Sequence, residues 1–193
     1  ERLSNEVRDI LALASILGKQ FEYRDLEALV EQRIDLEDTV DHLVRDGLLE
    51  EDRESRGDRL SFASGIVRDV LYGSLSRRKR RSLHRRYAEL LEKRFATKLD
   101  RVYPQLLHHF SQGDVPDKAV EYALKQATTS LHAFSPDETI RVTRIALEFL
   151  QDEEWPGEPS LEGEARLLLA KAHLQAGNIE LPVKEAEEAL KTL

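Results

Sequence analysis

The sequence contains no cysteine among its 193 residues. That absence excludes a disulfide framework, a thiol nucleophile and any cysteine-ligated metal, and because it suits a reducing compartment we expect a cytoplasmic protein. Methionine is also absent, and we expect the chain to be a segment of a longer polypeptide. No apolar run approaches the roughly 18 residues that cross a bilayer. The sequence therefore predicts neither a membrane span nor a signal peptide.

Motifs for nucleotide hydrolysis and nucleophilic catalysis are also missing. The sequence has no G-x-x-x-x-G-K-[ST] phosphate loop, no G-x-G-x-x-G fingerprint and no G-x-S-x-G nucleophile motif. His108 and His109 are adjacent, and because adjacent helical residues point about 100° apart, they suit packing better than a shared metal ion. We predict that the segment is not an enzyme, with no catalytic site, no metal and no cofactor of its own.

The charges fall into three blocks along a chain of net charge −8. Residues 1–76 carry 10 Lys and Arg against 18 Asp and Glu, residues 77–101 carry 11 against 3, and residues 102–193 carry 8 against 16. The basic block includes LSRRKRRSLHRR at 75–86. The acidic blocks on either side place carboxylates near this basic block at a high local concentration.

Residues 1–76 have the pattern of a winged helix, which consists of three helices and a β-hairpin. Ser4 is placed to cap the first helix and Gly18 to end it, YRDLEALV forms the second helix, and Asp35 caps the third. A polar tip lies between Leu48–Leu49 and Leu60–Phe62, and this pattern predicts two short strands. A further helix with Ile66, Val67, Val70, Leu71 and Leu75 at helical spacing follows.

Residues 77–100 are expected to form a basic linking helix, capped by Ser76. On a helical wheel, one face is apolar, and Arg80 falls on it. The apolar residues are Leu83, Tyr87, Leu90 and Leu91, with His84 at the flank as a packed, hydrogen-bonded ring. The other basic positions that we assign to interdomain or polyanion contact are Arg78, Arg81, Arg85 and Arg86.

Three interpretations of this basic helix remain open. The first is a solvated basic face, the second is contact with acidic groups of the same protein, and the third is contact with nucleic acid or another polyanion. Cations in the first turn of a helix oppose its macrodipole, which points to an acidic neighbour. The recognition helix of a winged helix must approach phosphates, yet residues 35–46 here carry five acids and only Arg45. We therefore expect the winged helix to contact protein rather than DNA.

Residues 101–193 are expected to form a helical array similar to tetratricopeptide repeats. The predicted helices cover 102–112, 117–134, 137–150, 161–176 and 180–193, and we expect Pro156, Gly157 and Pro159 to exclude a helix in QDEEWPGEPS. With Gly177 as the glycine between the two helices of a repeat, the pattern's packing positions are occupied by Leu169, Ala170, His173, Ala186, Ala189 and Leu190. Pro182 departs from the pattern.

The stretch LSFASGIVRDVLYGSLSRRKRRSLHRRYAELLEKR at 60–94 resembles a region of the bacterial signal-transduction ATPases with numerous domains, the STAND class. In that family a winged helix ends in F-x-H-x-L-h-R-(D/E)-x-h-Y, and an arginine-rich helix and a helical array follow. The matching residues are Phe62, Arg68, Asp69, Tyr72, Arg80, Arg81, Leu83, His84, Arg85 and Arg86.

The resemblance implies a non-catalytic regulatory and protein-interaction segment of a signal-transduction ATPase or transcriptional regulator. Its winged helix would pack on an absent ATPase core that binds ATP or ADP, Arg80 would tie the winged helix to the array, and the array would bind a protein or small inducer. The histidine that senses nucleotide phosphates in some members falls at Ser64, which lacks the charge and reach of imidazole. Alternative functions are a nucleic-acid-binding module that uses the basic helix and an oligomerisation scaffold.

Overall fold

The computed structural model describes residues 4–30, 35–52, 58–152, 158–178 and 180–192. Over these residues the chain is mostly helical with one small sheet, and it divides into an N-terminal unit, Glu1–Leu90, and a C-terminal unit, Leu91–Leu193. The division falls within α5 (Arg77–Arg94), so this helix contributes residues to both units. The three-part division into 1–76, 77–100 and 101–193 stays a prediction.

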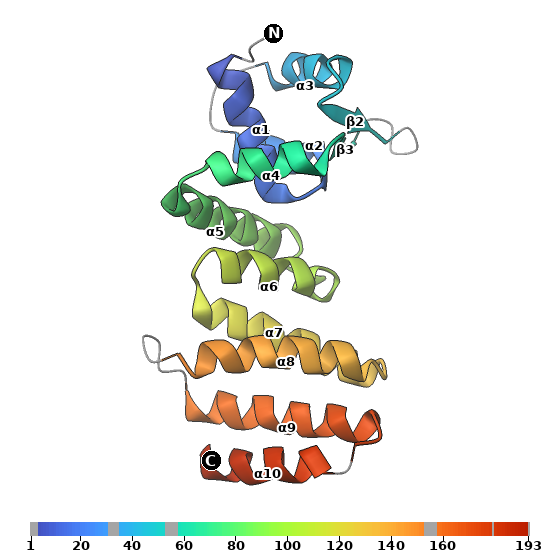
Figure 1. Ribbon diagram of the computed structural model, residues 1–193, viewed down its shortest axis with the longest axis vertical. Helices are drawn as coiled ribbons and strands as arrows, with labels where there is room; N and C mark the ends of the chain where they lie inside the picture. The colour runs from blue at the N-terminus through green and yellow to red at the C-terminus, as the bar shows by residue number, and fades with distance from the viewer. Residues whose placement is uncertain (1–3, 31–34, 53–57, 153–157, 179, 193) are drawn as a thin grey trace. The chain divides into compact units, whose positions relative to one another are not determined.

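The N-terminal unit begins with three short helices, α1 (Asn5–Leu17), α2 (Tyr23–Leu29) and α3 (Leu36–Arg45), as the sequence predicted (Figure 1). The Ser4 hydroxyl accepts a hydrogen bond from the Val7 N–H at 3.3 Å, and the Asp35 carboxylate accepts one from the Asp38 N–H at 3.1 Å. Both contacts satisfy N–H groups that have no partner inside the helix. Gly18 ends α1 with φ 118°, in a region that favours glycine.

A three-stranded antiparallel sheet has the order β1-β3-β2. The predicted hairpin is present as β2 (Leu49–Glu51) and β3 (Arg59–Phe62). The additional strand β1 (Gln20–Glu22) pairs with β3, so that Phe21 lies opposite Leu60. The sequence pattern did not predict β1, because a strand of three residues with a single buried side chain has no detectable alternation.

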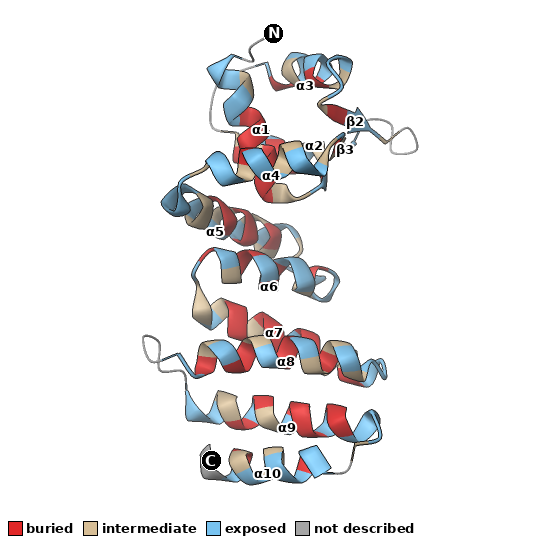
Figure 2. Ribbon diagram, viewed as in Figure 1, coloured by how far each residue is buried: buried red, intermediate tan, exposed pale blue. Residues whose placement is uncertain are grey.

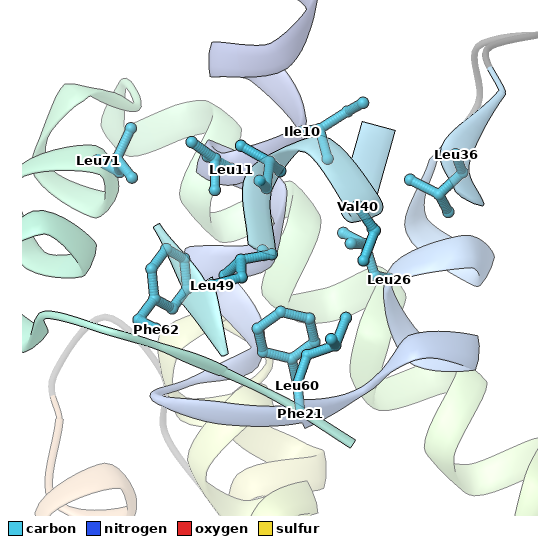
Figure 3. Packing of buried hydrophobic residues seen from close by; sticks show 12 residues of the cluster. Ile10, Leu11, Phe21, Leu26, Leu36, Val40, Leu49, Leu60, Phe62 and Leu71 are labelled. Atoms are coloured by element: carbon cyan, nitrogen blue, oxygen red, sulfur yellow. The ribbon is translucent and has the colours of Figure 1, made fainter. Parts of the chain in front are cut away.

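Apolar side chains from the helices and the sheet form the core of the N-terminal unit (Figure 3). The rings of Phe21 and Phe62 lie 6.0 Å apart at their centroids, and Leu11 is fully buried. The buried members of this core are Ile10, Leu11, Ala14, Phe21, Leu26, Leu36, Val40, Leu43, Leu49, Leu60, Phe62 and Leu71.

The helix α4 (Gly65–Ser74) follows β3 and packs on α1. The predicted helix is confirmed, but its apolar residues do not all face the core. Leu71 is buried, whereas the side chains of Ile66 and Val70 are 77% and 66% exposed. The next helix, α5, is capped by Ser76, whose hydroxyl accepts a hydrogen bond from the Lys79 N–H at 3.2 Å.

The C-terminal unit consists of a short 3-10 turn (Leu99–Val102) and the helices α6 (Tyr103–Gln112), α7 (Pro116–His132), α8 (Pro136–Leu150), α9 (Pro159–Gln175) and α10 (Glu180–Thr192). Consecutive helices pack on one another, and buried positions recur along them (Figure 2). The expectation that Pro159 excludes a helix is wrong. Pro159 begins α9, because the first helical position needs no N–H donor and proline already has a helical φ.

Three helices of this unit end in the same kind of turn. A residue with positive φ follows α6, α7 and α9: Asp114, Phe134 and Gly177. The N–H of the residue after each one donates to the carbonyl five residues back, at 2.9 to 3.1 Å, which is the hydrogen bond of a Schellman motif. Of the predicted repeat positions, Leu169, Ala170, His173 and Ala189 are buried, but Leu190 is 75% exposed.

Within the described residues, none of the helices combines the length and apolar character needed to span a bilayer.

We expect Leu11→Ala to lower the free energy of unfolding by about 2–5 kcal/mol, because it leaves a cavity at a fully buried position. Urea unfolding measures the change. The control Ile66→Ala removes a side chain that is 77% exposed and should stay within about 0.5 kcal/mol of the wild type. Equal losses in the two variants would contradict the assigned core.

Candidate functional site

Several residues of the stretch 60–94 contact Tyr72 on α4. The Arg80 guanidinium from α5 lies over its ring, 5.0 Å from the centroid, and the Arg68 guanidinium lies 5.4 Å from the same centroid. Both distances suit cation–π attraction. Arg80 is half-buried, its Nε has no hydrogen-bond partner among the described residues, and its guanidinium contacts the Tyr72 ring.

His84 meets Tyr72 from the same helix as Arg80. The His84 Nε2 and the Tyr72 hydroxyl are 3.0 Å apart, and the two rings meet edge to face with centroids 5.8 Å apart. Only 2% of His84 is exposed. The prediction of a packed, hydrogen-bonded histidine is confirmed, and the residues Arg68, Tyr72, Arg80 and His84 form one cluster that we call the Tyr72 cluster.

Two further contacts hold α5 to α2. The Tyr87 hydroxyl donates a hydrogen bond to the buried Asp25 carboxylate at 2.8 Å, and the Arg86 guanidinium donates one to the Ala28 carbonyl at 3.0 Å. Ala28 lies in the last turn of α2, where carbonyls lack helical partners, so a cation is favourable there. The role of Asp25 was not predicted from the sequence, although Asp25 and Leu29 are four residues apart and share a helix face.

The remaining predicted contact residues face an open surface of α5. Arg78 and Arg85 are exposed and Arg81 is half-buried. Together with Arg77 and Ser82 they line a shallow groove of about 440 Å³. The five predicted arginines therefore separate into Arg80 and Arg86, whose contacts to α4 and α2 are described above, and three that line this groove. Their role in interdomain or polyanion contact stays a prediction.

The surface of α3 is negative. Glu37, Asp38 and Asp41 are exposed, and the Arg45 guanidinium donates a hydrogen bond to the Asp41 carbonyl at 3.2 Å. The negative potential reaches Tyr23, whose pKa is raised by burial and by the charges of Glu27, Glu37, Asp35 and Asp41. A DNA backbone at this surface would be repelled rather than attracted.

Ser64 is the N-cap of α4. Its hydroxyl oxygen accepts a hydrogen bond from the Val67 N–H at 3.5 Å, and the residue is half-buried. One acceptor position is therefore used by the helix, while the O–H hydrogen stays available as a donor. A contact between Ser64 and a nucleotide stays a prediction.

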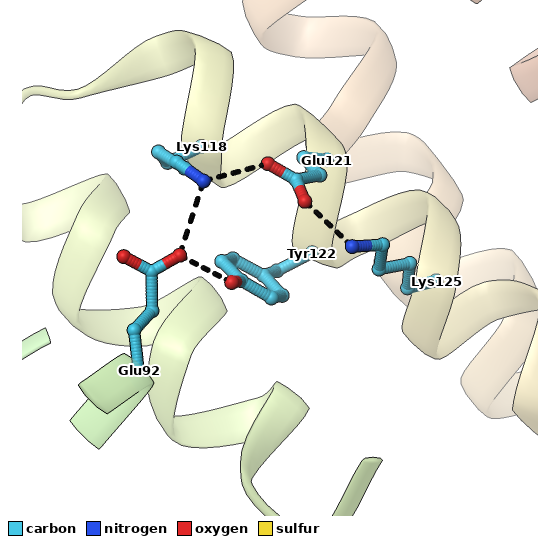
Figure 4. A network of polar contacts seen from close by, with 5 residues as sticks. All are labelled: Glu92, Lys118, Glu121, Tyr122 and Lys125. Atoms are coloured by element: carbon cyan, nitrogen blue, oxygen red, sulfur yellow. Dashed lines mark hydrogen bonds and ion pairs between the residues drawn. The ribbon is translucent and has the colours of Figure 1, made fainter. Parts of the chain in front are cut away.

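The C-terminal unit has a polar network around Tyr122 (Figure 4). The Tyr122 hydroxyl donates a hydrogen bond to Glu92 Oε1, and the Lys118 ammonium lies 3.1 Å from the same oxygen. Lys118 is also 3.0 Å from Glu121, which pairs with Lys125 at 2.5 Å. This network was not predicted from the sequence, because Glu92 and Tyr122 are distant in sequence and match no motif.

The pKa values in this network follow from burial and from the ion pairs. Burial, the hydrogen bond to Glu92 and the charge of Glu92 raise the pKa of Tyr122. Burial alone would raise the pKa of Glu121, but hydrogen bonds from Lys125 and Lys118 outweigh it and hold that pKa below the ordinary 4.5. The network therefore keeps Glu121 ionised and Tyr122 protonated, which suits a structural role rather than proton transfer.

A second groove, of about 530 Å³, lies over α7 and α9 in the C-terminal unit. It carries carboxylates from Asp117, Glu121 and Glu164, against one cation from Lys125. Its other lining residues are Tyr103, Leu124, Thr128, Thr129 and Leu161.

Exposed apolar side chains gather on the last two helices and on one turn. Among the described residues, the large exposed ones on α9 and α10 are Leu167, Leu174, Leu181, Val183 and Leu190. Phe134, in the turn after α7, is 81% exposed and has φ 53°, a conformation that is uncommon for a bulky residue. A contiguous patch of exposed apolar side chains would mark an interaction surface, whereas single exposed ones are normal.

His108 and His109 are neighbours on α6. His108 is exposed and His109 is buried, and their rings lie 4.9 Å apart at their centroids with planes that meet at 81°. A ring nitrogen of each lies within 4.8 Å of one on the other, and the expectation that they do not share a metal ion stays a prediction.

No family model matches the chain, and no curated protein matches it. Among solved structures, the chain is similar to the crystal structure of a signal transduction ATPase with numerous domains (STAND) protein with a tetratricopeptide repeat sensor from Pyrococcus horikoshii. The two share 15% sequence identity with a TM-score of 0.39. The match covers 98% of this chain and 44% of that chain, so the chain spans less than half the length of that protein.

The pKa of Glu121 is lower in the folded state than in the unfolded state. The Glu121 carboxylate therefore stabilises the folded state at pH values above its unfolded pKa, and this stabilisation is lost as pH falls through its folded pKa. We expect Glu121→Gln to lower the Tm at neutral pH and to have a smaller effect below about pH 4. Thermal unfolding followed by circular dichroism measures both. Glu148→Gln, at an exposed position on α8, is the control. A Tm difference between Glu121→Gln and the wild type that is equal at both pH values would contradict a lowered pKa of Glu121 in the folded state.

Proposed function

We propose that the chain is a non-catalytic regulatory and protein-interaction segment of a larger bacterial signal-transduction ATPase or transcriptional regulator in the cytoplasm. Its N-terminal unit is a winged helix that packs on the absent ATPase core, and its C-terminal unit is a tetratricopeptide-like array that binds a protein or small inducer. ATP or ADP belongs to that absent core. The observation that carries the proposal is the joining of Arg68, Tyr72, Arg80 and His84 in one cluster.

The topology of the N-terminal unit supports a winged helix. The order α1-β1-α2-α3-β2-β3, with β3 between β1 and β2, is the order of three helices and a wing hairpin. Its third helix carries the exposed acids Glu37, Asp38 and Asp41, where a DNA reader needs cations near the phosphates. A protein surface is therefore the better partner for this winged helix.

The C-terminal unit supports a repeat array that binds a partner. The Schellman turns after α6, α7 and α9 repeat one geometry, and small buried residues such as Ala123, Ala146 and Ala172 let adjacent helices approach closely. The exposed Phe134 and the apolar residues of α9 and α10 provide surface for a protein contact.

We expect the purified chain to show no ATP turnover and no binding of duplex DNA at about 150 mM salt. A nucleotide-release assay and fluorescence anisotropy with a labelled duplex measure the two activities. Light scattering over a concentration series distinguishes a monomeric receptor segment from an oligomerisation scaffold.

Turnover by the chain would overturn the non-catalytic assignment. Salt-sensitive duplex binding that is lost when Arg78, Arg81 and Arg85 are changed to Glu would instead establish the nucleic-acid-binding alternative. Assembly that rises with concentration would establish the scaffold.

A further inference from the structure

A groove of about 530 Å³ in the N-terminal unit lies between α1, the end of α2 and the first half of α5. Its floor is apolar. Ile10, Leu29 and Leu83 are buried beneath it, and the half-buried Leu13 and Val30 contribute to its walls. A ligand with apolar side chains could bury them on this apolar floor, and removing both apolar surfaces from water favours binding.

The rim of this groove is positive. Arg78 and Lys79 stand on the first turn of α5, Arg86 stands two turns further along, and Asp9 is the one acid of the lining. Among the described residues, Arg78 and Lys79 form no ion pair, and the first turn of α5 has no acidic residue. Two unpaired cations at a helix N-terminus oppose the macrodipole, and an anion placed there would relieve that repulsion.

The hydrogen bond from Arg86 to the Ala28 carbonyl holds the third cation in place. Arg86 is eight positions after Arg78, which corresponds to about 12 Å along a helix. The groove therefore has an apolar strip with positive charge at both ends. A helix of two to three turns matches that spacing if it carries acids at both ends and apolar residues between them.

We infer that this groove is a docking site for an acidic amphipathic helix of a partner protein. Carboxylates at the ends of that helix pair with Arg78, Lys79 and Arg86, and apolar side chains at i, i+3, i+4 and i+7 rest on Leu13, Val30 and the floor. The positive rim would attract a nucleic acid, but the apolar floor would not, because phosphate groups gain no binding free energy from contact with apolar surface. The groove would take such a helix whether or not the chain belongs to an ATPase.

The test uses the whole chain and a fluorescein-labelled synthetic peptide of about 16 residues, long enough to form a helix on binding. The peptide carries leucine at i, i+3, i+4 and i+7 and glutamate on the flanking turns. Two matched peptides replace every glutamate with lysine or every leucine with serine. At about 150 mM salt, anisotropy should show binding of the first peptide and of neither matched peptide.

Arg78→Glu combined with Lys79→Glu should weaken binding of the acidic peptide at least about tenfold, or about 1.4 kcal/mol. Arg144→Glu combined with Lys171→Glu reverses the same number of exposed charges in the C-terminal unit and should bind as the wild type does. Leu13→Ser should also weaken binding, and thermal unfolding checks that each variant is folded.

Four results of the peptide experiments would overturn the inference. They are no binding of the acidic peptide, equal binding of the serine peptide, unchanged binding by the Arg78 and Lys79 variant, and displacement of the peptide by a DNA duplex. The last result would assign the groove to polyanions. Self-association of the chain that the Arg78 and Lys79 variant abolishes would assign it to a second copy instead, and this too would overturn the inference.

Discussion

Side-chain contacts from α5 to α2 and α4 are the constraint on which the account of this chain depends. The Tyr87 hydroxyl donates to the buried Asp25 carboxylate, Arg86 donates to the last turn of α2, and Tyr72 contacts both Arg80 and His84. A buried carboxylate without its donor is costly, so the Asp25 contact strongly favours this position of α5. An arginine-rich helix that looks suited to nucleic acid is thereby held by four contacts within one unit of the protein.

The arrangement of charge follows from those contacts. Arg80 contacts α4, and Arg86 is held by the Ala28 carbonyl at one end of the groove, while Arg78 and Lys79 stand on its rim without an ion pair among the described residues. The helix that would enter a DNA groove, α3, has a negative surface, and burial, the charge of Glu27 and the charges of this surface together raise the pKa of Tyr23. We propose that the positive and negative surfaces of the N-terminal unit serve protein contacts, and the apolar floor beside Arg78 supports that proposal.

Local signals in the sequence predicted most helices and the hairpin, because capping residues and helical periodicity act over a few positions. Ser4, Asp35 and Ser76 were expected as caps, and each accepts the expected backbone hydrogen bond. The strand β1 is too short to give such a signal, and its pairing with β3 depends on residues about 40 positions away. The contact between Asp25 and Tyr87 spans 62 positions, and only the fold brings these two side chains together.

A double-mutant cycle between Asp25 and Tyr87 tests the central claim most directly. Urea unfolding of the wild type, Asp25→Ala, Tyr87→Phe and the double variant gives the coupling between the two side chains. If their hydrogen bond holds α5 to α2, the coupling should be about 1 kcal/mol or more. Additive losses that agree within about 0.3 kcal/mol would contradict it.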